Sequence, residues 1–498
     1  MVYKSIPVGW TEISLTDDLL FIKTGVNEYE GEKEYFSTGS IQDGSISSEG
    51  RYSYSNRPSR ANRIAQKGDI FQARMKNTNK ALLIDKSLNS KLFSTGFFQI
   101  RPDPKSINNK YIFYYLSSLT FHEVKDKFCT GSTQESLSDK NAKNILIPIP
   151  PIHEQHRIVE KIEEFFSEID KGIEYLQTTK EQLEVYRQAI LKAAFEGKLT
   201  QGWRNSRASN QSKNELINRI KKIQKEQYST IQINSVSKKK LTTSRKQNFK
   251  YLSENYASFL DNIPSNWILM DVESLLTIFD KGMTTGPFGT VLSKKDHRKD
   301  GRPVLGIENI CNGNFVKGNK IFVDEEFAER LDAYSVKADD IIISRSGTVG
   351  EICCVPVGWE NSLISSNLIK LSLNTRIINP KYFVFLFQSK VIVYDQVLEL
   401  CKGSTRVFLN QKILKSIVYP IPPIEEQEQI VQELESRISV CDHMEETIKK
   451  GLVQAESLKQ SILKKAFEGR LVPQDPDDEP AAVLLEQIRE EKRKQEEA

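Results

Sequence analysis

Apolar residues recur at alternating spacings of three and four in two long segments of the chain, residues 147–200 and 419–472. The segments align without a gap, and roughly 24 of about 54 positions are identical. The apolar positions of the first are Ile162, Phe166, Ile169, Ile173, Leu176, Leu183, Ile190 and Ala194. Those of the second are Leu434, Ile438, Cys441, Ile448, Leu452, Ala455, Ile462 and Ala466. The spacing is typical of a coiled coil and predicts two long helices.

The boundaries of these helices are marked by proline and glycine. A proline-rich approach at residues 148–151 excludes a central strand, and helix is expected from residues 152–154 to near Gly197. That is about 43 residues, or roughly 65 Å. We expect antiparallel pairing with pseudo-twofold symmetry, although each helix could instead pack on its own globular part. Charged residues interrupt the apolar seam at Lys180, Arg187, Glu445 and Lys459.

Both helices end in Ala-Phe-Glu-Gly-Lys/Arg-Leu. These helix ends have more apolar surface than the pairing of two helices should need, which predicts a docking surface for another subunit. Core packing is an equally simple reading of Phe195 and Phe467.

The regions before the helices, residues 1–146 and 256–418, mix short apolar runs with one or two helical stretches. Strands are expected at 70–73, 82–84, 97–100, 304–307, 341–344, 352–355 and 368–373, with helices at 111–119 and 382–388. Ile-Pro-x-x-Trp opens both regions, ending at Trp10 and Trp267. We therefore predict an α+β fold of two tandem globular domains, each followed by a long helix.

Residues 201–255 differ in composition from the rest. Serine, asparagine, glutamine and lysine dominate, which predicts a basic flexible linker with one short helix at 216–225. Residues 473–498 form a charged tail, in which residues 481–493 repeat the pattern of that short helix.

Composition narrows the class of protein. The 498 residues include 38% hydrophobic and 27% charged residues, with a net charge of +4, which fits a soluble globular protein of several domains. No apolar run approaches the roughly 18 residues of a membrane helix. The beginning has no signal-peptide pattern, and the six cysteines show no C-x-x-C pair, so we expect reduced thiols and a cytoplasmic location.

Basic and aromatic residues gather in the first globular region between Arg51 and Lys67, a stretch without acids, and further basic residues follow shortly after it. Basic groups among tyrosines suit phosphate neutralisation and contact with base edges. A solvated loop is the alternative. The DNA-contact candidates here are Arg51, Tyr52, Tyr54, Arg57, Arg60, Arg63, Arg74, Lys76 and Gln134.

The second globular region carries a similar patch after a Thr-Thr-Gly-Pro-Phe-Gly-Thr run. Glycine and proline there also fit a purely structural turn. The DNA-contact candidates are Thr284, Thr285, Lys294, Lys295, Arg298, Arg302, Arg345 and Arg406.

Motifs of catalysis are not found in the sequence. There is no G-x-x-x-x-G-K-S/T loop for ATP and no N/D-P-P-F/Y tetrapeptide of the kind that holds a target amine. His153 and His156 lie three apart without further ligands, which favours a surface pair over a metal site. Asp103 with Glu123 and Lys125 fits the loose P-D…E-x-K nuclease pattern, but the acids fall in a turn and a helix rather than on adjacent strands. We predict no catalytic residue and no metal site.

Together these motifs resemble a known family. Two variable domains, each followed by P-I-P-P-I-x-E-Q-x-x-I-V and ending A-F-E-G-K/R-L, are similar to the specificity subunit of type I restriction–modification enzymes. The likeness covers nearly the whole chain. The first domain departs from the family pattern because it has no Thr-Gly-Pro-Phe-Gly loop.

The resemblance implies two target-recognition domains that each read half of a split DNA sequence. It implies that the helices separate the domains and dock two methyltransferase subunits, with motor-nuclease subunits joining for cleavage. S-adenosylmethionine, ATP and magnesium would then belong to those partners and not to this chain. Two alternatives remain: a chain that itself cuts or methylates DNA, and a coiled-coil DNA-binding scaffold without sequence readout.

Overall fold

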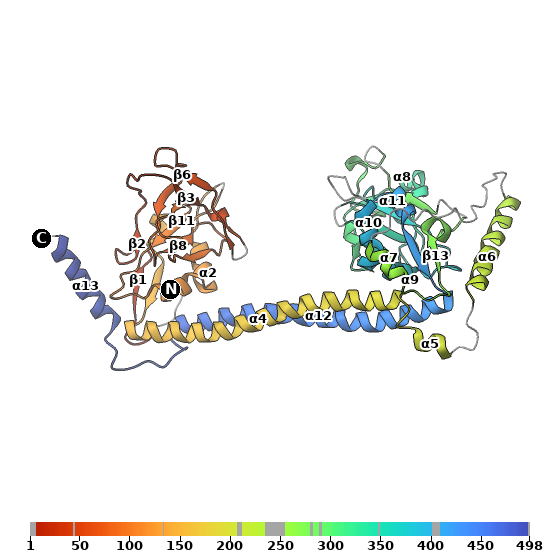
Figure 1. Ribbon diagram of the computed structural model, residues 1–498. Helices are drawn as coiled ribbons and strands as arrows, with labels where there is room; N and C mark the ends of the chain where they lie inside the picture. Colours follow the sequence, from red (N-terminus) through yellow and green to blue (C-terminus); the bar gives the residue numbers. More distant parts are fainter. Residues whose placement is uncertain are drawn as a thin grey trace. The chain divides into compact units, whose positions relative to one another are not determined.

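The computed structural model describes residues 6–42, 45–132, 134–206, 212–234, 254–278, 282–287, 291–346, 349–400 and 409–496. The chain divides into two compact units (Figure 1). Unit 1 comprises Met1–Thr178 with Ile448–Ala498, and unit 2 comprises Thr179–Thr447. The predicted long helices are α4 (Ile152–Phe195) and α12 (Ile424–Phe467), each 44 residues long. Each helix contributes one end to each unit.

The globular part of unit 1 contains two four-stranded sheets, in the orders β6-β3-β10-β7 and β2-β11-β8-β9. A separate pair, β1 with β12, runs antiparallel and joins the beginning of the domain to the approach of α4. The strands are β1 (Thr11–Ser14), β2 (Phe21–Ile22), β3 (Lys33–Phe36), β4 (Ile41–Gln42), β5 (Ser45–Ile46), β6 (Gly50–Tyr52), β7 (Ala61–Ile64), β8 (Ile70–Ala73), β9 (Ala81–Leu83), β10 (Leu92–Ser94), β11 (Phe97–Ile100) and β12 (Leu146–Ile149). The shorter helices are η1 (Thr38–Ser40), α1 (Asn109–Leu116), α2 (Leu119–Lys127), α3 (Asp139–Ala142) and α13 (Ala481–Glu496).

Unit 2 has sheets in the orders β14-β22-β19-β20 and β18-β15-β21, and again an antiparallel pair, β13 with β23, before its long helix. The strands are β13 (Ile268–Asp271), β14 (Met283–Thr285), β15 (Arg302–Leu305), β16 (Ile310–Cys311), β17 (Asn314–Phe315), β18 (Phe322–Val323), β19 (Ile341–Ser344), β20 (Ile352–Cys354), β21 (Leu363–Ile364), β22 (Leu368–Leu371) and β23 (Val418–Ile421). The helices are α5 (Gln201–Ser206), α6 (Lys213–Asn234), α7 (Glu254–Leu260), η2 (Val272–Leu275), η3 (Lys294–Asp296), η4 (Ile307–Asn309), α8 (Glu325–Arg330), η5 (Asp332–Tyr334), α9 (Pro380–Gln388), η6 (Lys390–Tyr394), α10 (Asp395–Leu400) and α11 (Gln411–Ser416).

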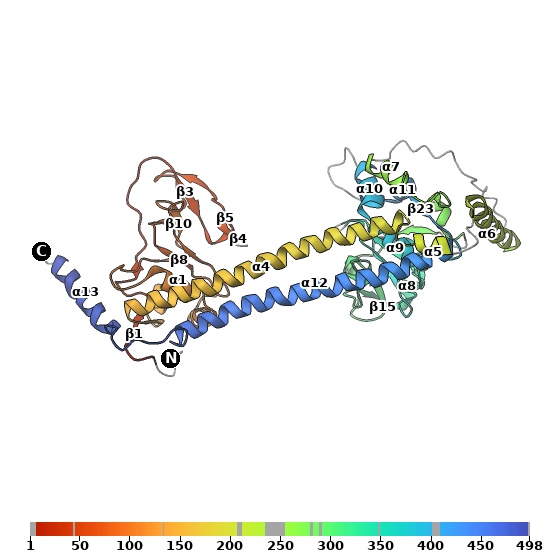
Figure 2. The same ribbon diagram turned by 60° about the horizontal axis from the view of Figure 1, so that its bottom comes forward.

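Within each unit the ends of the two long helices lie side by side and antiparallel. Figures 1 and 2 both show the start of α4 beside the end of α12 in unit 1, and the end of α4 beside the start of α12 in unit 2. Charged residues that interrupt the apolar seam find partners across it: Lys459 pairs with Asp170 in unit 1, and Arg187 pairs with Asp442 in unit 2. Opposite charges therefore replace apolar contacts at the interrupted positions.

The helix ends lie inside the domain cores rather than on an open docking surface, which corrects one of the two readings of the Ala-Phe-Glu-Gly segments. Phe467 is 1% exposed and packs on the rings of Tyr111 and Tyr115, at 5.4 and 5.1 Å between centroids. In unit 2, Phe195 is fully buried and packs on Tyr382 at 5.5 Å. In unit 1 the beginning of α4 packs in the same core as the end of α12. Each long helix therefore packs both on the other helix and on its own globular domain.

The helix terminations also contact the domains. Gly469 and Gly197 adopt positive φ angles of 67° and 68°, as expected for glycine after a helix. A side chain at Gly469 would lie 2.4 Å from Pro7, and one at Gly197 would lie 2.4 Å from Pro264. Glycine is therefore required at both sites for the close approach as well as for the backbone conformation.

The short helices after the long ones complete the two cores. In unit 1, α13 buries Ala481, Leu485 and Ile488, and its Arg489 pairs with Asp17 at 2.8 Å. In unit 2, α6 buries Leu216, Ile220 and Ile223. The helix predicted at 216–225 is thus part of a longer one, and the remainder of the predicted linker, residues 207–211 and 235–253, lies outside the described residues. Of the helices within those described residues, none is both long enough and apolar enough to cross a membrane.

Candidate nucleic-acid interface

The beginning of each long helix is locked to its domain by the same set of hydrogen bonds. The indole of Trp10 donates to Glu154 at 3.0 Å, and that of Trp267 donates to Glu426 at 3.0 Å. Gln155 likewise accepts from the backbone N–H of Asn108 at 2.7 Å and donates to the carbonyls of Ser106 and Pro150. Gln427 makes the equivalent bonds in unit 2. These buried amides and carboxylates fix the position of each globular domain on the start of its long helix.

The two buried glutamates differ in their second oxygen. Glu426 accepts from Thr200 at 2.8 Å and pairs with the Arg204 guanidinium. The second oxygen of Glu154 is buried without a hydrogen-bond partner, and burial raises the pKa of Glu154 against the opposing effect of the Trp10 bond. The sequence after α12 has valine and proline where Thr200 and Arg204 follow α4, which accounts for the difference.

An aromatic platform supports the first basic patch of unit 1. The Arg57 guanidinium lies 3.9 Å above the ring of Tyr54, whose edge meets Tyr29 at 5.7 Å. Tyr52, on β6, packs edge-on against Tyr35 at 6.0 Å. Arg51 and Arg60 stand exposed on either side of this loop. Of the predicted arginines and tyrosines, Arg57 and Tyr54 are therefore in direct contact, whereas Arg51 and Arg60 are exposed.

Two arginines of that prediction are not free surface groups. Arg63 is fully buried and donates to the carbonyl of Ile22 at 3.0 Å, and burial lowers its pKa to about 10. This corrects the expectation of a DNA contact at Arg63, which lies on the inward face of β7. Arg74 stacks on Phe98 at 3.8 Å and pairs with Asp139 at 2.6 Å, so its guanidinium is largely committed to the fold.

A second surface of unit 1 forms where the β8–β9 turn meets the loop at 129–136. The ammonium of Lys76 pairs with Glu135 at 2.6 Å, and the amide nitrogen of Gln134 lies 3.5 Å from the Met75 sulfur. Met75 and Ser136 form an isolated antiparallel bridge. Lys76 and Gln134 are thus neighbours on this surface.

In unit 2, Thr285 and Arg345 lie at one end of the sheet β14-β22-β19-β20. Thr285 accepts from the Gln411 amide at 3.0 Å, and the Arg345 backbone donates to Asn367 at 2.9 Å. Thr284 is buried on β14 and faces the interior. Sequence reasoning missed Gln411 and Asn367. Their contacts with Thr285 and Arg345 arise from the tertiary fold, and no sequence motif marked them.

The lysine-rich patch of unit 2 lies on a different sheet. Lys294 and Lys295 are exposed on η3. Arg298 pairs with Asp324 at 3.0 Å, and Arg302 pairs with Glu325 on α8. Two of the four cations are therefore neutralised by acids. Arg406 and the end of the Gly-Pro-Phe-Gly run, residues 288–290, lie outside the described residues.

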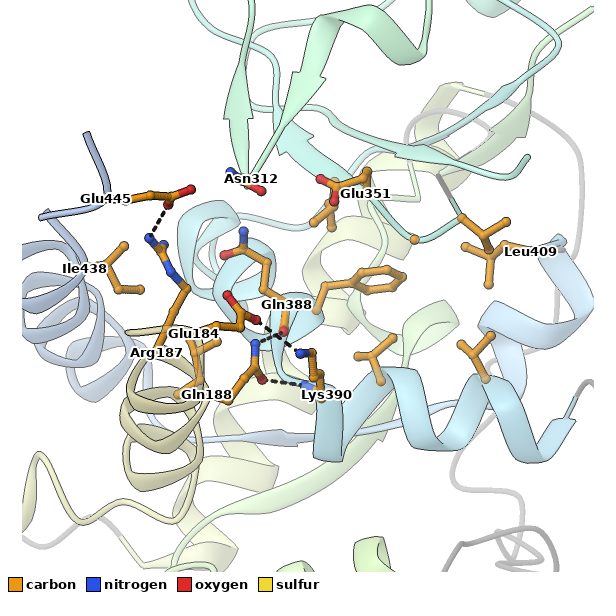
Figure 3. Close-up of a pocket in the computed structure, with 17 residues that line it drawn as sticks. Glu184, Arg187, Gln188, Asn312, Glu351, Gln388, Lys390, Leu409, Ile438 and Glu445 are labelled. Atoms are coloured by element: carbon orange, nitrogen blue, oxygen red, sulfur yellow. Dashed lines mark hydrogen bonds and ion pairs between the residues drawn. The ribbon is translucent and has the colours of Figure 1, made fainter. Parts of the chain in front are cut away.

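A cavity of about 550 Å³ lies between α4, α12 and the globular part of unit 2 (Figure 3). Figure 3 shows Arg187 and Glu445 paired at one side and Lys390 reaching Glu184 and Gln188 at another. Apolar side chains line much of the remainder: Leu191, Ile352, Phe387, Val393, Val397, Leu409 and Ile438.

The residues of the nuclease-like pattern and of the histidine pair make contacts with other groups. Asp103 pairs with Lys492 at 3.0 Å, Glu123 is exposed on α2, and the Lys125 ammonium binds backbone carbonyls. His156 hydrogen-bonds to the amide of Asn108 at 3.0 Å. No group of three potential metal ligands occurs among the residues that the structure describes.

Comparison with known proteins identifies the family that this chain matches. The family described as "Type I restriction modification DNA specificity domain" matches residues 7–184 and 286–454. The Type I restriction enzyme EcoBI specificity subunit of Escherichia coli is 26% identical over 397 residues, which cover 77% of this chain and 72% of that protein. The EcoKI specificity subunit of Escherichia coli strain K12 is 25% identical, over 79% and 74% of the two chains.

Longer matches agree. The MjaVIII specificity subunit of Methanocaldococcus jannaschii is 20% identical over 94% of both chains. A solved structure from a study of complex assembly and conformational transition of the type I R-M system has a TM-score of 0.63 at 17% identity and covers 94% of this chain, so the fold is shared. Since the family match covers more than half of the sequence, the chain belongs to the type I restriction–modification DNA specificity family.

Proposed function

We propose that this chain is the DNA-specificity subunit of a type I restriction–modification enzyme, and that it has no catalytic role of its own. Each unit reads one half of a split DNA target. The observation that carries this is the repeated plan of the two units: the mounting of the domains on the helices is nearly identical, whereas the loops that carry basic and aromatic residues differ. A duplicated reader of two different sequences requires such a division between constant mounting and variable loops.

The partners follow from the same proposal. We expect two methyltransferase subunits to dock and motor-nuclease subunits to join for cleavage, with S-adenosylmethionine, ATP and magnesium bound by those partners. Large apolar side chains are exposed on the long helices. They are Tyr175, Val453 and Leu458 in unit 1, and Val185, Tyr186, Val440 and Met444 in unit 2. These side chains, rather than the buried phenylalanines, are the candidate docking contacts.

The first test separates phosphate contacts from the rest of the surface. In the complex with its methyltransferase, the combined variant Arg51→Gln, Arg60→Gln, Lys294→Gln and Lys295→Gln should bind a target duplex with a shallower dependence on salt. Each lost phosphate contact lowers the slope of log K against log salt by about 1. Affinity measured by fluorescence anisotropy from roughly 50 to 200 mM salt gives the slope.

A matched variant controls for net charge. Lys171→Gln, Lys180→Gln, Lys221→Gln and Lys222→Gln remove four exposed lysines outside the proposed surface and should leave the slope nearly unchanged. Equal slopes for the two quadruple variants would contradict the placement of the DNA surface. An affinity that falls steeply with salt concentration but is the same for duplexes of every sequence would instead favour the scaffold without sequence readout.

A further inference from the structure

Unit 1 contains a buried cation that takes no part in the hydrogen bonds between the globular domain and the start of α4. Lys125, on α2, is fully buried, and its ammonium donates to the carbonyls of Met75 and Thr78, both at 2.8 Å. These carbonyls belong to the turn between β8 and β9, residues 75–79. The ammonium therefore holds the turn from beneath at two points.

A second group fixes the same turn. The carboxylate of Asp126 accepts from the backbone N–H of Asn77 at 3.2 Å, and Asn77 has a φ of 57°, a left-handed conformation that asparagine tolerates better than most residues. On the opposite side, the N–H of Lys76 donates to the carbonyl of Glu135 at 3.1 Å. The backbone of the turn is thus held from both α2 and the loop at 129–136.

Burying an ammonium in order to bind two carbonyls of a surface turn costs free energy, because exposed carbonyls could form the same hydrogen bonds with water. Burial lowers the pKa of Lys125, against the opposing charge of Asp126. A buried charge gives little net stability, and one recognised use of it is to specify a single conformation. The conformation specified here is that of the turn and of the side chains that the turn displays.

The displayed side chains suit the reading of bases. Asn77 and Asn79 are both exposed, and neither side-chain amide bonds to another residue within the described part of the chain. An asparagine amide presents one donor and one acceptor side by side, which matches the major-groove edge of adenine. Lys76, whose ammonium pairs with Glu135, and Gln134, whose amide contacts the Met75 sulfur, lie next to them.

We propose that residues 75–79 form a base-reading turn of unit 1, in which Asn77 and Asn79 contact an adenine-containing half-site and Lys125 and Asp126 are positioning residues. This inference rests on the proposed function and specifies where in unit 1 that function is carried out. It applies to unit 1 alone. At the constant offset that aligns the two copies, Val397 stands where unit 1 has Lys125. Val397 lines the cavity of unit 2, together with Val349 and Gly350 of the connection between β19 and β20.

The test maps methylated sites in DNA from an unmodified host that expresses the chain with its methyltransferase. Asn77→Ala and Asn79→Ala should each lower the preference for the correct base at one or two positions of a single half-site, by between about fivefold and 150-fold. Lys125→Met should relax the same positions, and Lys125→Arg should restore part of the preference. Lys127→Met, the same change at an exposed position of α2, should leave the motif unchanged.

The other half-site distinguishes misplacement of the turn from misfolding. If the turn alone is affected, the base preference at the other half-site is unchanged, whereas an unfolded chain loses the whole motif. Retention of the wild-type motif by both asparagine variants would overturn the inference, as would equal relaxation of both half-sites by Lys125→Met. If the unchanged chain directs no split motif, the proposed function itself fails, and that outcome is read before any variant is compared.

Discussion

Replacing Phe467 by alanine is expected to lower the free energy of unfolding of unit 1 by about 3–5 kcal/mol, the usual cost of removing a buried phenylalanine. Its ring lies between Tyr111 and Tyr115 and is 1% exposed, so the cavity left behind has little means of closing. Denaturant unfolding followed by tyrosine and tryptophan fluorescence measures the change. Phe195→Ala should have a similar effect on unit 2 because Phe195 packs on Tyr382 in the same way.

Leu458→Ala provides the control for Phe467→Ala. Leu458 lies on α12 as well but is 51% exposed, so its removal should change the free energy of unfolding by less than about 0.5 kcal/mol. If Phe467→Ala were no more destabilising than Leu458→Ala, the helix end would not be part of the core of unit 1. Weakened binding of the methyltransferase without loss of stability would restore the docking interpretation of the Ala-Phe-Glu-Gly segment.

Lengthening both long helices by one heptad is expected to lengthen the non-specific spacer of the DNA target by about two to three base pairs. Seven residues add roughly 10.5 Å of helix, against about 3.4 Å per base pair. The insertions would follow Thr178 in α4 and Thr447 in α12, where the two units divide, and a heptad keeps the apolar positions in register. The methylated motif reports the spacer directly.

A length-preserving exchange controls for the inserted sequence. Replacing seven residues of each helix at the same places with the heptads used for insertion should leave the spacer unchanged. A folded, active double-insertion variant that keeps the original spacer would contradict the view that the helices set the separation of the half-sites.

The elements with the strongest apolar signal could be predicted from the sequence. The strands at 70–73, 97–100 and 341–344 consist almost wholly of buried residues and are found as β8, β11 and β19 with the same bounds. The helix termination at Gly197 is confirmed by its positive φ. The segment that packs against each apolar surface was harder to predict, because periodicity shows that a face is buried but not what buries it. For this reason docking and core packing both stayed open for the Ala-Phe-Glu-Gly segments, and the burial of Phe195 and Phe467 confirms core packing for these two side chains.

The candidate site was predictable in part. The charge run that includes Arg57 and Arg60 does form a surface, but a count of charges ignores which way a strand directs each side chain. Arg63 alternates with Asn62 on β7 and shares the buried face of Ala61, so the period of two contained the signal. Lys125 lies four residues after Phe121 on a helix, and that spacing places it on the buried face. The contacts that tie it to residues 75–79 depend on the tertiary fold and could not be read from the sequence.

The most direct test of the account is a map of methylated adenines. The chain and its methyltransferase would be expressed together in an unmodified host, and single DNA molecules would be sequenced for methyladenine. We expect a split motif, two short specific sequences separated by a fixed non-specific spacer, that disappears when this chain is omitted. An undivided motif, or methylation that is the same without this chain, would contradict this expectation.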